Sequence, residues 1–250
     1  MKHHVAFQVE RYGDADARLL YERTALFHFG PRGTPATLGA DARRHFQLRD
    51  LIRWGAPLAL LGADQLTLHA ASARKNDATI AVMGPGGAGE STLARRLELR
   101  RWTMLSDDLI ACDVDACVDG RSERVLRDWC VEAARDWREG APIAYEALVR
   151  RLRSEAAAWT PLHAVLFLEQ TRTSAARFDI RWLAPRETFE LLTRHGFGKV
   201  PWPTAWAHQT QVHARLASTV AAAVVASPDG LERMADAVPA LEHVVLTRIG

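Results

Sequence analysis

The sequence predicts an α/β fold organised around a glycine-rich loop. The first observation is that short apolar runs alternate with segments of helical periodicity along most of the 250 residues, as is typical of strands that alternate with helices. The second is the stretch Gly-Pro-Gly-Gly-Ala-Gly-Glu-Ser-Thr at residues 84–92, which lies between an apolar run and a helical segment. Strands and helices arranged around such a turn indicate an α/β domain.

The first 60 residues are predicted to form a small strand and helix portion. Weak alternation predicts short strands around Val5–Val9 and Ala25–Phe29, and a turn-forming cluster follows at Pro31–Pro35. Apolar positions at helical spacing between residues 41 and 60 predict a helix. We therefore expect residues 1–60 to pack on a larger core formed by residues 61–250.

The segment around the glycine-rich loop has the clearest pattern. Gln65–Ala73 is strand-like, Thr79–Met83 is a short apolar run, and the polar residues between them predict a hairpin whose second strand enters the loop. The loop is predicted to open a helix from about Ser91 to Arg100. A buried strand, Trp102–Leu105, is then expected to end in Ser106-Asp107-Asp108, and residues 109–114 could extend it.

The rest of the chain continues the alternation after a helical insertion. Residues 121–160 lack strand alternation and predict helices inserted into the core. Ala164–Glu169 and Phe178–Leu183 are predicted as paired strands, and a helix from Pro185 is expected to stop at Gly196. The final predicted elements are a helix at 206–218, a strand at 221–226, a short helix at 230–235 and a strand at 244–248.

The composition argues against several classes of protein. A net charge of +2 with arginines spread along the chain favours no nucleic-acid partner. The longest apolar run, Val220–Ala226, is too short to span a bilayer, and the N-terminus lacks the apolar segment of a signal peptide. Three cysteines without paired spacing do not make a disulfide framework. We expect a soluble, cytoplasmic protein without a nucleic-acid or membrane partner.

The glycine-rich loop matches a phosphate-binding pattern with one substitution. The pattern G-x-x-x-x-G-K-[ST] is met at Gly84, Gly89 and Ser91, but Glu90 stands at the lysine position. In such loops the backbone N–H groups surround the phosphates, the lysine reaches the β- and γ-phosphates, and the hydroxyl binds Mg²⁺. Glu90 therefore places an acid where a cation normally meets the phosphates.

His69, this loop and the pair Asp107-Asp108 follow one another along the chain, and together they indicate a phosphoryl-transfer site. The loop would hold phosphates at a helix N-terminus, where the dipole favours anions. A carboxylate at the end of a neighbouring strand would help to hold the metal. The second carboxylate could accept the proton of an attacking hydroxyl, with the histidine beside it.

Three stretches of this region carry a resemblance to a known family. They are Leu68-His69-Ala70-Ala71-Ser72-Ala73, the loop from Gly84 to Leu93, and Met104-Leu105-Ser106-Asp107-Asp108. They resemble the serine kinases of the HPr kinase/phosphorylase type. They are most similar to the short HPr-kinase-like proteins that accompany ribosomal-peptide gene clusters, including lasso-peptide precursor kinases. The resemblance covers about residues 58–115.

The resemblance implies a fold, an activity and partners. The fold would be a P-loop α/β core related to that of phosphoenolpyruvate carboxykinases, with a strongly bent mixed sheet. The activity would be transfer of phosphate from ATP, with Mg²⁺, to a serine hydroxyl on a peptide or small protein. Some members of the family are hexamers, so a homo-oligomer is compatible with the resemblance.

The resemblance also assigns roles to residues of this chain. His69, Asp107 and Asp108 would be catalytic, one aspartate as the base and the other at the metal, and which does which stays open. Ser91 and Asp107 would hold Mg²⁺. The nucleotide phosphates would be held by Gly84, Gly86, Gly87, Ala88, Gly89, Glu90, Ser91 and Thr92.

Two departures from the family pattern bear on these expectations. Residues 121–160 are rich in Arg, Glu and Ala where the larger HPr kinases have a Gly-rich, basic acceptor loop. Glu90 is the other departure, since one charge pair about 4 Å apart at an effective dielectric of about 20 is worth about 4 kcal/mol.

Four readings of Glu90 stay open. It could turn away as an acid at a helix start, or bind a further metal ion. Another cation, such as Arg95, Arg96 or Lys75, could replace the lysine. The loop could also no longer bind a nucleoside triphosphate. In that last case the chain would be a pseudokinase that binds a peptide or protein without catalysis.

Overall fold

In a computed structural model the chain forms two compact units. Unit 1 comprises Met1–Leu66, Ser122–Ala157 and Gly198–Gln209, and unit 2 comprises Thr67–Arg121, Ala158–Phe197 and Thr210–Gly250. The described residues are 7–12, 16–21, 24–29, 37–38, 66–107, 109–113, 115–119, 124–125, 128–129, 150–151, 159–196 and 203–250.

Unit 1 contains an antiparallel four-stranded sheet in the order β1-β2-β3-β4. Its strands are β1 (Phe7–Tyr12), β2 (Asp16–Tyr21), β3 (Thr24–Phe29) and β4 (Thr37–Leu38). The strands predicted around residues 5–9 and 25–29 correspond to β1 and β3. The sequence reading missed β2, whose central position in the meander gives it a partner on each side.

The helix expected between residues 41 and 60 lies outside the described residues. Most of the helical insertion expected at 121–160 lies outside them as well. The residues described there are helical at 124–125, 128–129 and 150–151, and extended from residue 159.

Unit 2 is built on a mixed six-stranded sheet in the order β13-β14-β12-β7-β6-β8. Its strands are β6 (Ala71–Lys75), β7 (Ala78–Met83), β8 (Thr103–Ser106), β12 (Ala164–Leu168), β13 (Asp179–Trp182) and β14 (Ala221–Ala226). Strands β14, β12 and β7 are parallel neighbours. Every residue of β12 is buried, as expected for a central parallel strand covered on both faces.

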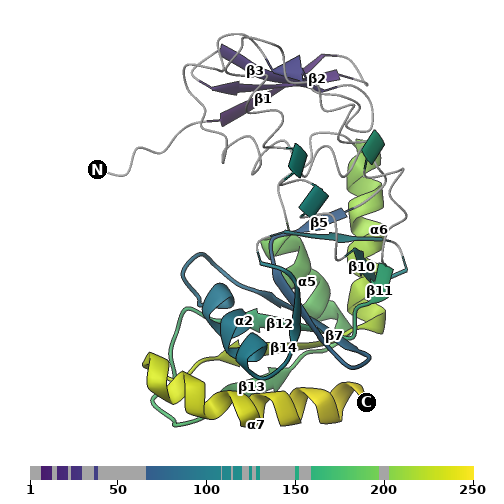
Figure 1. Cartoon of the computed structure of the whole chain (residues 1–250). Coiled ribbons are helices and arrows are strands. Elements are labelled where there is room, and N and C mark those ends of the chain that lie inside the picture. Colours follow the sequence, from purple (N-terminus) through teal and green to yellow (C-terminus); the bar gives the residue numbers. More distant parts are fainter. Residues whose placement is uncertain are drawn as a thin grey trace. The chain divides into compact units, whose positions relative to one another are not determined.

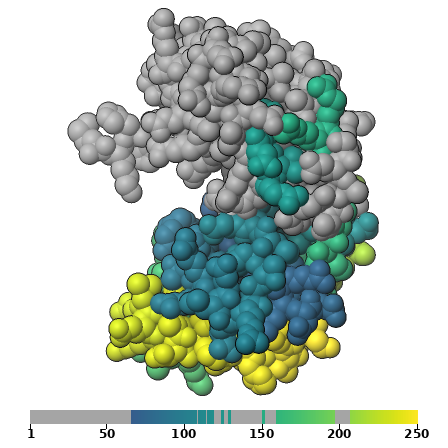
Figure 2. Space-filling view, in the orientation of Figure 1, coloured from purple at the N-terminus to yellow at the C-terminus, as the bar shows by residue number. Residues whose placement is uncertain are grey.

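Helices cover both faces of this sheet (Figure 1). Helix α2 (Glu90–Leu99) and helix α7 (Leu231–Ile249) share one hydrophobic core with alternate residues of the strands. The opposite face carries α5 (Pro185–His195), whose His195 ring lies 6.2 Å from the Phe167 ring of β12. Helix α6 (Pro203–Thr219) contacts α5, because the rings of His213 and Phe189 meet edge to face at 6.4 Å. In the space-filling view of Figure 2, the blue-teal surface around α2 adjoins the yellow surface of α7.

A second, small sheet has the order β11-β10-β9-β5. Its strands are β5 (Leu66–Leu68), β9 (Ile110–Cys112), β10 (Cys117–Asp119) and β11 (Trp159–Pro161). The single strand predicted over residues 65–73 is therefore two strands in two sheets, β5 and β6, interrupted at His69-Ala70. Residues 109–114 do not extend β8, because β9 belongs to this small sheet.

Three further predictions about the elements have a clear outcome. The helix from Pro185 stops at Gly196 as predicted. The strand at 178–183 exists as β13, but it pairs with β14 and not with β12. The predicted last strand at 244–248 is wrong, because α7 continues to Ile249. The reason is the helical spacing of its buried residues, Met234, Ala237, Val238, Leu241 and Val245.

The α/β class with a mixed sheet is thus confirmed. None of the helices in the described part of the chain combines the length and the apolar character needed to cross a bilayer.

Candidate phosphate-binding site

The candidate site lies at one end of the six-stranded sheet, where β7 ends and Gly84 begins the loop. We call this end of the sheet the loop end. The parallel strands β14, β12 and β7 all finish there. Strand β8 finishes there too, because β6 is antiparallel to both β7 and β8. Ligands of open α/β sheets bind outside the carboxyl ends of parallel strands, so the geometry places four connecting segments where a ligand could touch them.

The glycine-rich loop joins β7 directly to α2, as the sequence predicts. Gly87 and Gly89 have φ angles of 85° and 106°, which residues with a side chain rarely adopt. A backbone hydrogen bond from Ala88 N to Pro85 O, 2.9 Å long, closes the turn. Helix α2 begins at Glu90, and its N-cap, Gly89, offers no side-chain acceptor to the first N–H groups. Those groups have no partner inside the helix and favour an anion.

The base and the apex of the loop differ in how closely other atoms pack against them. A Cβ atom on Gly84 would lie 2.8 Å from the Leu168 carbonyl oxygen, so only glycine lets β7 pass β12 this closely. A Cβ atom on Gly86 or Gly87 would meet nothing within 4 Å. The apex of the loop is therefore open, while its base is tightly packed against the neighbouring strand.

Glu90 folds back toward the base of the loop. Its Oε1 atom is buried and lies 3.3 Å from the position that a Cβ on Gly84 would occupy. The carboxylate thus lies beside the end of β7. An acid in the first turn of a helix is also favoured by the helix dipole.

The structure brings His69 and Asp107 to the same end of the sheet as the loop. Ala71 pairs with Val82 and Ser72 pairs with Ser106, so the segment before β6 and the segment after β8 both lie at the loop end. Strand β6 separates β7 from β8, which puts their axes about 10 Å apart. His69 is half-buried and Asp107 is exposed. Asp108 lies outside the described residues.

The turn that carries the acidic pair is held by a buried serine. Ser106 Oγ donates a hydrogen bond to the Leu109 carbonyl at 2.6 Å and accepts one from Leu109 N at 3.2 Å. Ser106 is 5% exposed. These bonds close the turn from residue 106 to residue 109 and so limit the positions open to Asp107.

The first turn of α2 supplies the two hydroxyl groups of the pattern. Ser91 is exposed and Thr92 is half-buried. Mg²⁺ in phosphate sites is usually held by one or two protein ligands together with the phosphates and water. Ser91 and Asp107 at one end of the sheet fit that donor set. Among the described residues no three His, Cys, Asp or Glu side chains gather into a metal-binding group, a larger set than such a site requires.

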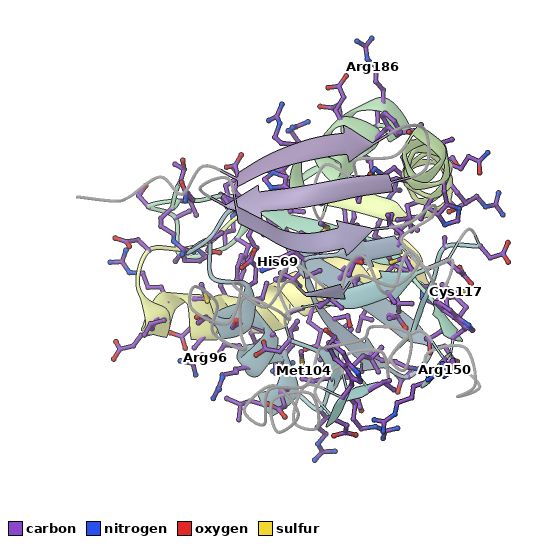
Figure 3. All side chains as sticks on the ribbon, turned by 90° about the horizontal axis from the view of Figure 1, so that it is seen from above. His69, Arg96, Met104, Cys117, Arg150 and Arg186 are labelled. Atoms are coloured by element: carbon purple, nitrogen blue, oxygen red, sulfur yellow. The ribbon has the colours of Figure 1, made fainter. Side chains whose placement is uncertain are left out.

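Of the cations considered from the sequence, Lys75 is too far from the loop to replace the lysine. Lys75 lies at the opposite end of the sheet, where its ammonium pairs with Glu242 of α7 and donates to the Arg100 carbonyl at 3.1 Å. Arg95 is exposed on α2. The side chain of Arg96, also on α2, lies apart from His69 in the view of Figure 3.

Two residues that the sequence reading missed contact the loop. Both follow β12: Gln170 Nε2 donates to the Gly86 carbonyl at 3.1 Å, and the guanidinium of Arg172 lies against Gly89. The sequence pattern led us to pair residues 164–169 with 178–183, and it made no prediction for the segment between them. Recognising that β12 is a parallel neighbour of β7 would have placed that segment beside the loop.

Comparison with known proteins adds no family to this picture: no protein-family model and no curated protein matches the chain.

Proposed function

We propose that the protein is an ATP-dependent phosphotransferase similar to the HPr-type serine kinases, acting on a serine hydroxyl of a peptide or small protein. The observation that carries the proposal is the uncapped N-terminus of α2 behind a loop with two left-handed glycines and an open apex. The fold would then be a P-loop core of the phosphoenolpyruvate carboxykinase type with a bent sheet.

The roles proposed for the residues follow their positions. Apart from Ala88 N, which donates to the Pro85 carbonyl, the N–H groups of residues 86–92 would bind the phosphates. Ser91 with one of Asp107 and Asp108 would hold Mg²⁺. When bound, Mg²⁺ would neutralise charge on the phosphates. The serine oxygen would attack the γ-phosphorus while its proton passes to the other aspartate. The bond from phosphorus to the bridging oxygen would break, and ADP would leave with that electron pair.

The direct test is transfer of radiolabel from [γ-³²P]ATP with Mg²⁺ to an array of serine-containing peptides. Transfer by the wild-type protein is expected. Asp107→Asn and Asp108→Asn should each reduce the rate by about a hundredfold or more, because general-base and metal-holding groups contribute that much. The exposed Asp77, at the other end of the sheet, provides the control Asp77→Asn. Absence of transfer, or equal rates in all the variants, would contradict the proposal.

Glu90 motivates one alternative, a pseudokinase that binds a peptide or protein without catalysis. The two functions differ in nucleotide binding. A ligand that binds only the folded state increases the free energy of unfolding, by about 2.7 kcal/mol when its concentration is a hundred times Kd. The melting temperature rises as a result. A rise with Mg-ATP or Mg-ADP would favour the phosphotransferase. No rise in the wild type, with a rise in Glu90→Lys, would favour the binding module.

A further inference from the structure

Arg172 places a guanidinium against the glycine that starts α2. A Cβ atom on Gly89 would lie 3.3 Å from Arg172 Nη2 and 3.6 Å from Nη1. Gly89 is also the residue before the lysine position of the pattern. The positive charge absent at residue 90 is therefore present beside the same turn, delivered from the segment after β12.

The segment that carries Arg172 is anchored on both sides. Gln170 Nε2 binds the Gly86 carbonyl, which ties the segment to the apex of the loop. Thr173 N donates to the Ser227 carbonyl at 2.9 Å, and Asp229 N donates to the Thr173 carbonyl at 3.1 Å. Arg172 thus lies between two residues fixed by hydrogen bonds to the loop and to the segment after β14. A side chain on such a segment needs little reordering when a ligand binds.

The guanidinium has capacity left for an anion. Arg172 Nη1 is buried and has no hydrogen-bond partner among the described residues. Buried polar groups are normally hydrogen-bonded, and an exception calls for a physical explanation. A guanidinium offers paired N–H donors that match two phosphate oxygens. An oligophosphate bound over the uncapped start of α2 would supply the acceptors that this nitrogen lacks.

We propose that Arg172 performs the task of the P-loop lysine in this chain, binding the phosphate tail of a nucleotide while Glu90 stays turned toward Gly84. This inference rests on the proposed nucleotide-binding function. It identifies the ligand chemistry as an oligophosphate, and it explains how an acidic residue at position 90 is compatible with phosphate binding. The cation comes from the neighbouring parallel strand and not from the loop itself.

The test measures the dissociation constant of Mg²⁺ with mant-ATP, a fluorescent ATP analogue, on the full chain, with tripolyphosphate as a competitor. Arg172→Met removes the charge and keeps the length of the side chain, and Arg172→Lys keeps a charge without the paired donors. Arg177, exposed in the same connection, gives the matched control Arg177→Met. We expect Arg172→Met to weaken mant-ATP and tripolyphosphate binding by about tenfold to a hundredfold. Arg172→Lys should fall between, and Arg177→Met should bind like the wild type.

A second pair of variants tests whether residues 90 and 172 share one task. Glu90→Lys added to Arg172→Met should recover most of the lost affinity, since it restores a cation at the usual place. Thermal unfolding without nucleotide checks that each variant is folded, and Arg172→Lys remains informative if Arg172→Met is not.

The outcomes separate this inference from the function on which it rests. If the wild type binds mant-ATP and Arg172→Met and Arg172→Lys bind it equally well, Arg172 does not replace the lysine, while the nucleotide-binding function stands. If the wild type binds neither mant-ATP nor tripolyphosphate, the proposed function is wrong, and the proposed role of Arg172 is then wrong as well.

Discussion

The two ends of the six-stranded sheet differ in whether their buried charged groups have partners. At the hairpin end, where β6 turns into β7, Lys75 and Arg100 both pair with Glu242 of α7. At the loop end, Arg172 Nη1 and the Oγ of the buried Ser227 have no hydrogen-bond partner among the described residues. The ion pairs at the hairpin end hold α2 and α7 on the sheet. The groups there without a partner among the described residues, Thr79 Oγ1 and Trp102 Nε1, are uncharged, whereas at the loop end a charged guanidinium nitrogen lacks an acceptor, which indicates a place for an anion.

The ion pairs at the hairpin end lower the pKa of Glu242. Burial by itself raises the pKa of this carboxyl, but hydrogen bonds from Lys75 and Arg100 outweigh burial and lower it below its ordinary value. The side chain of Glu242 is 6% exposed. The ionised form is therefore the one that the fold stabilises, and its two partners come from β6 and from the end of α2.

The largest expected effect is the loss of this cluster. Glu242→Gln should lower the free energy of unfolding by about 3 kcal/mol, the low end for breaking a buried ion pair, because Lys75 and Arg100 stay partly in contact with water. Urea denaturation of the wild type and the variant at pH 7.5 measures it. The exposed pair of Arg186 and Glu190 on α5 supplies the control Glu190→Gln, expected to cost under about 0.5 kcal/mol. Equal costs for the two variants would contradict the contrast between a closed cluster and a surface pair.

Acid should act first on a buried histidine of α6. His213 is 2% exposed, and burial lowers its pKa to about 4 from 6.5. Because the folded state binds this proton less well than the unfolded state, stability is full above pH 6.5 and falls as the pH drops toward 4. Between pH 7.5 and pH 5 the free energy of unfolding should fall by about 2 kcal/mol on this account.

His213→Leu isolates that effect and sharpens the comparison of the two ends. The variant should lose most of the fall between pH 7.5 and pH 5 in urea denaturation. Glu242 should then account for a further loss below its unfolded pKa of 4.5, since its pKa in the fold is lowered. An unchanged fall in His213→Leu would show that another group governs the acid range, with His195 the next candidate because burial lowers its pKa too.

A smaller effect is expected from the backbone of the loop. Gly89→Ala places a side chain at a φ of 106° and against Arg172, and should cost about 1 to 2 kcal/mol of stability. Gly86→Ala is the matched control, since a Cβ there meets nothing within 4 Å, and it should cost under about 0.5 kcal/mol. Thermal or urea unfolding of the two variants side by side is sufficient. A larger cost at Gly86 would contradict the described loop conformation.

The smallest effect distinguishes a binding residue from a structural one. Arg172→Met should change the free energy of unfolding without nucleotide by under about 0.5 kcal/mol, because Arg172 Nη1 has no protein acceptor to lose among the described residues. Urea denaturation at pH 7.5 measures the change. A loss as large as that of Glu242→Gln would mean that Arg172 is part of the fold and that the two ends of the sheet do not differ as described.

Part of the fold and of the candidate site could be predicted from the sequence, because residues close together in the chain determine it. The hairpin of β6 and β7, the glycine loop and the start of α2 are contiguous, and each follows from alternation, turn residues and helical spacing within a few residues. Asp107 follows β8 as predicted for the same reason, and Asp108 lies outside the described residues. The break at His69-Ala70 could not be predicted, since packing against distant elements decides it. The helical spacing that extends α7 to Ile249 is present in the sequence and was overlooked.

Of this protein, the sequence by itself determined that a phosphate-binding pattern sits between a strand and a helix and that an acid replaces its lysine. Only the tertiary structure decided which cationic side chain lies against that loop, namely Arg172. Strands β7 and β12 are adjacent and parallel although about eighty residues separate them in the chain, and hydrogen bonding between distant strands leaves no local pattern. The neighbourhood of Gly89 and Arg172 therefore exists only once the sheet has formed.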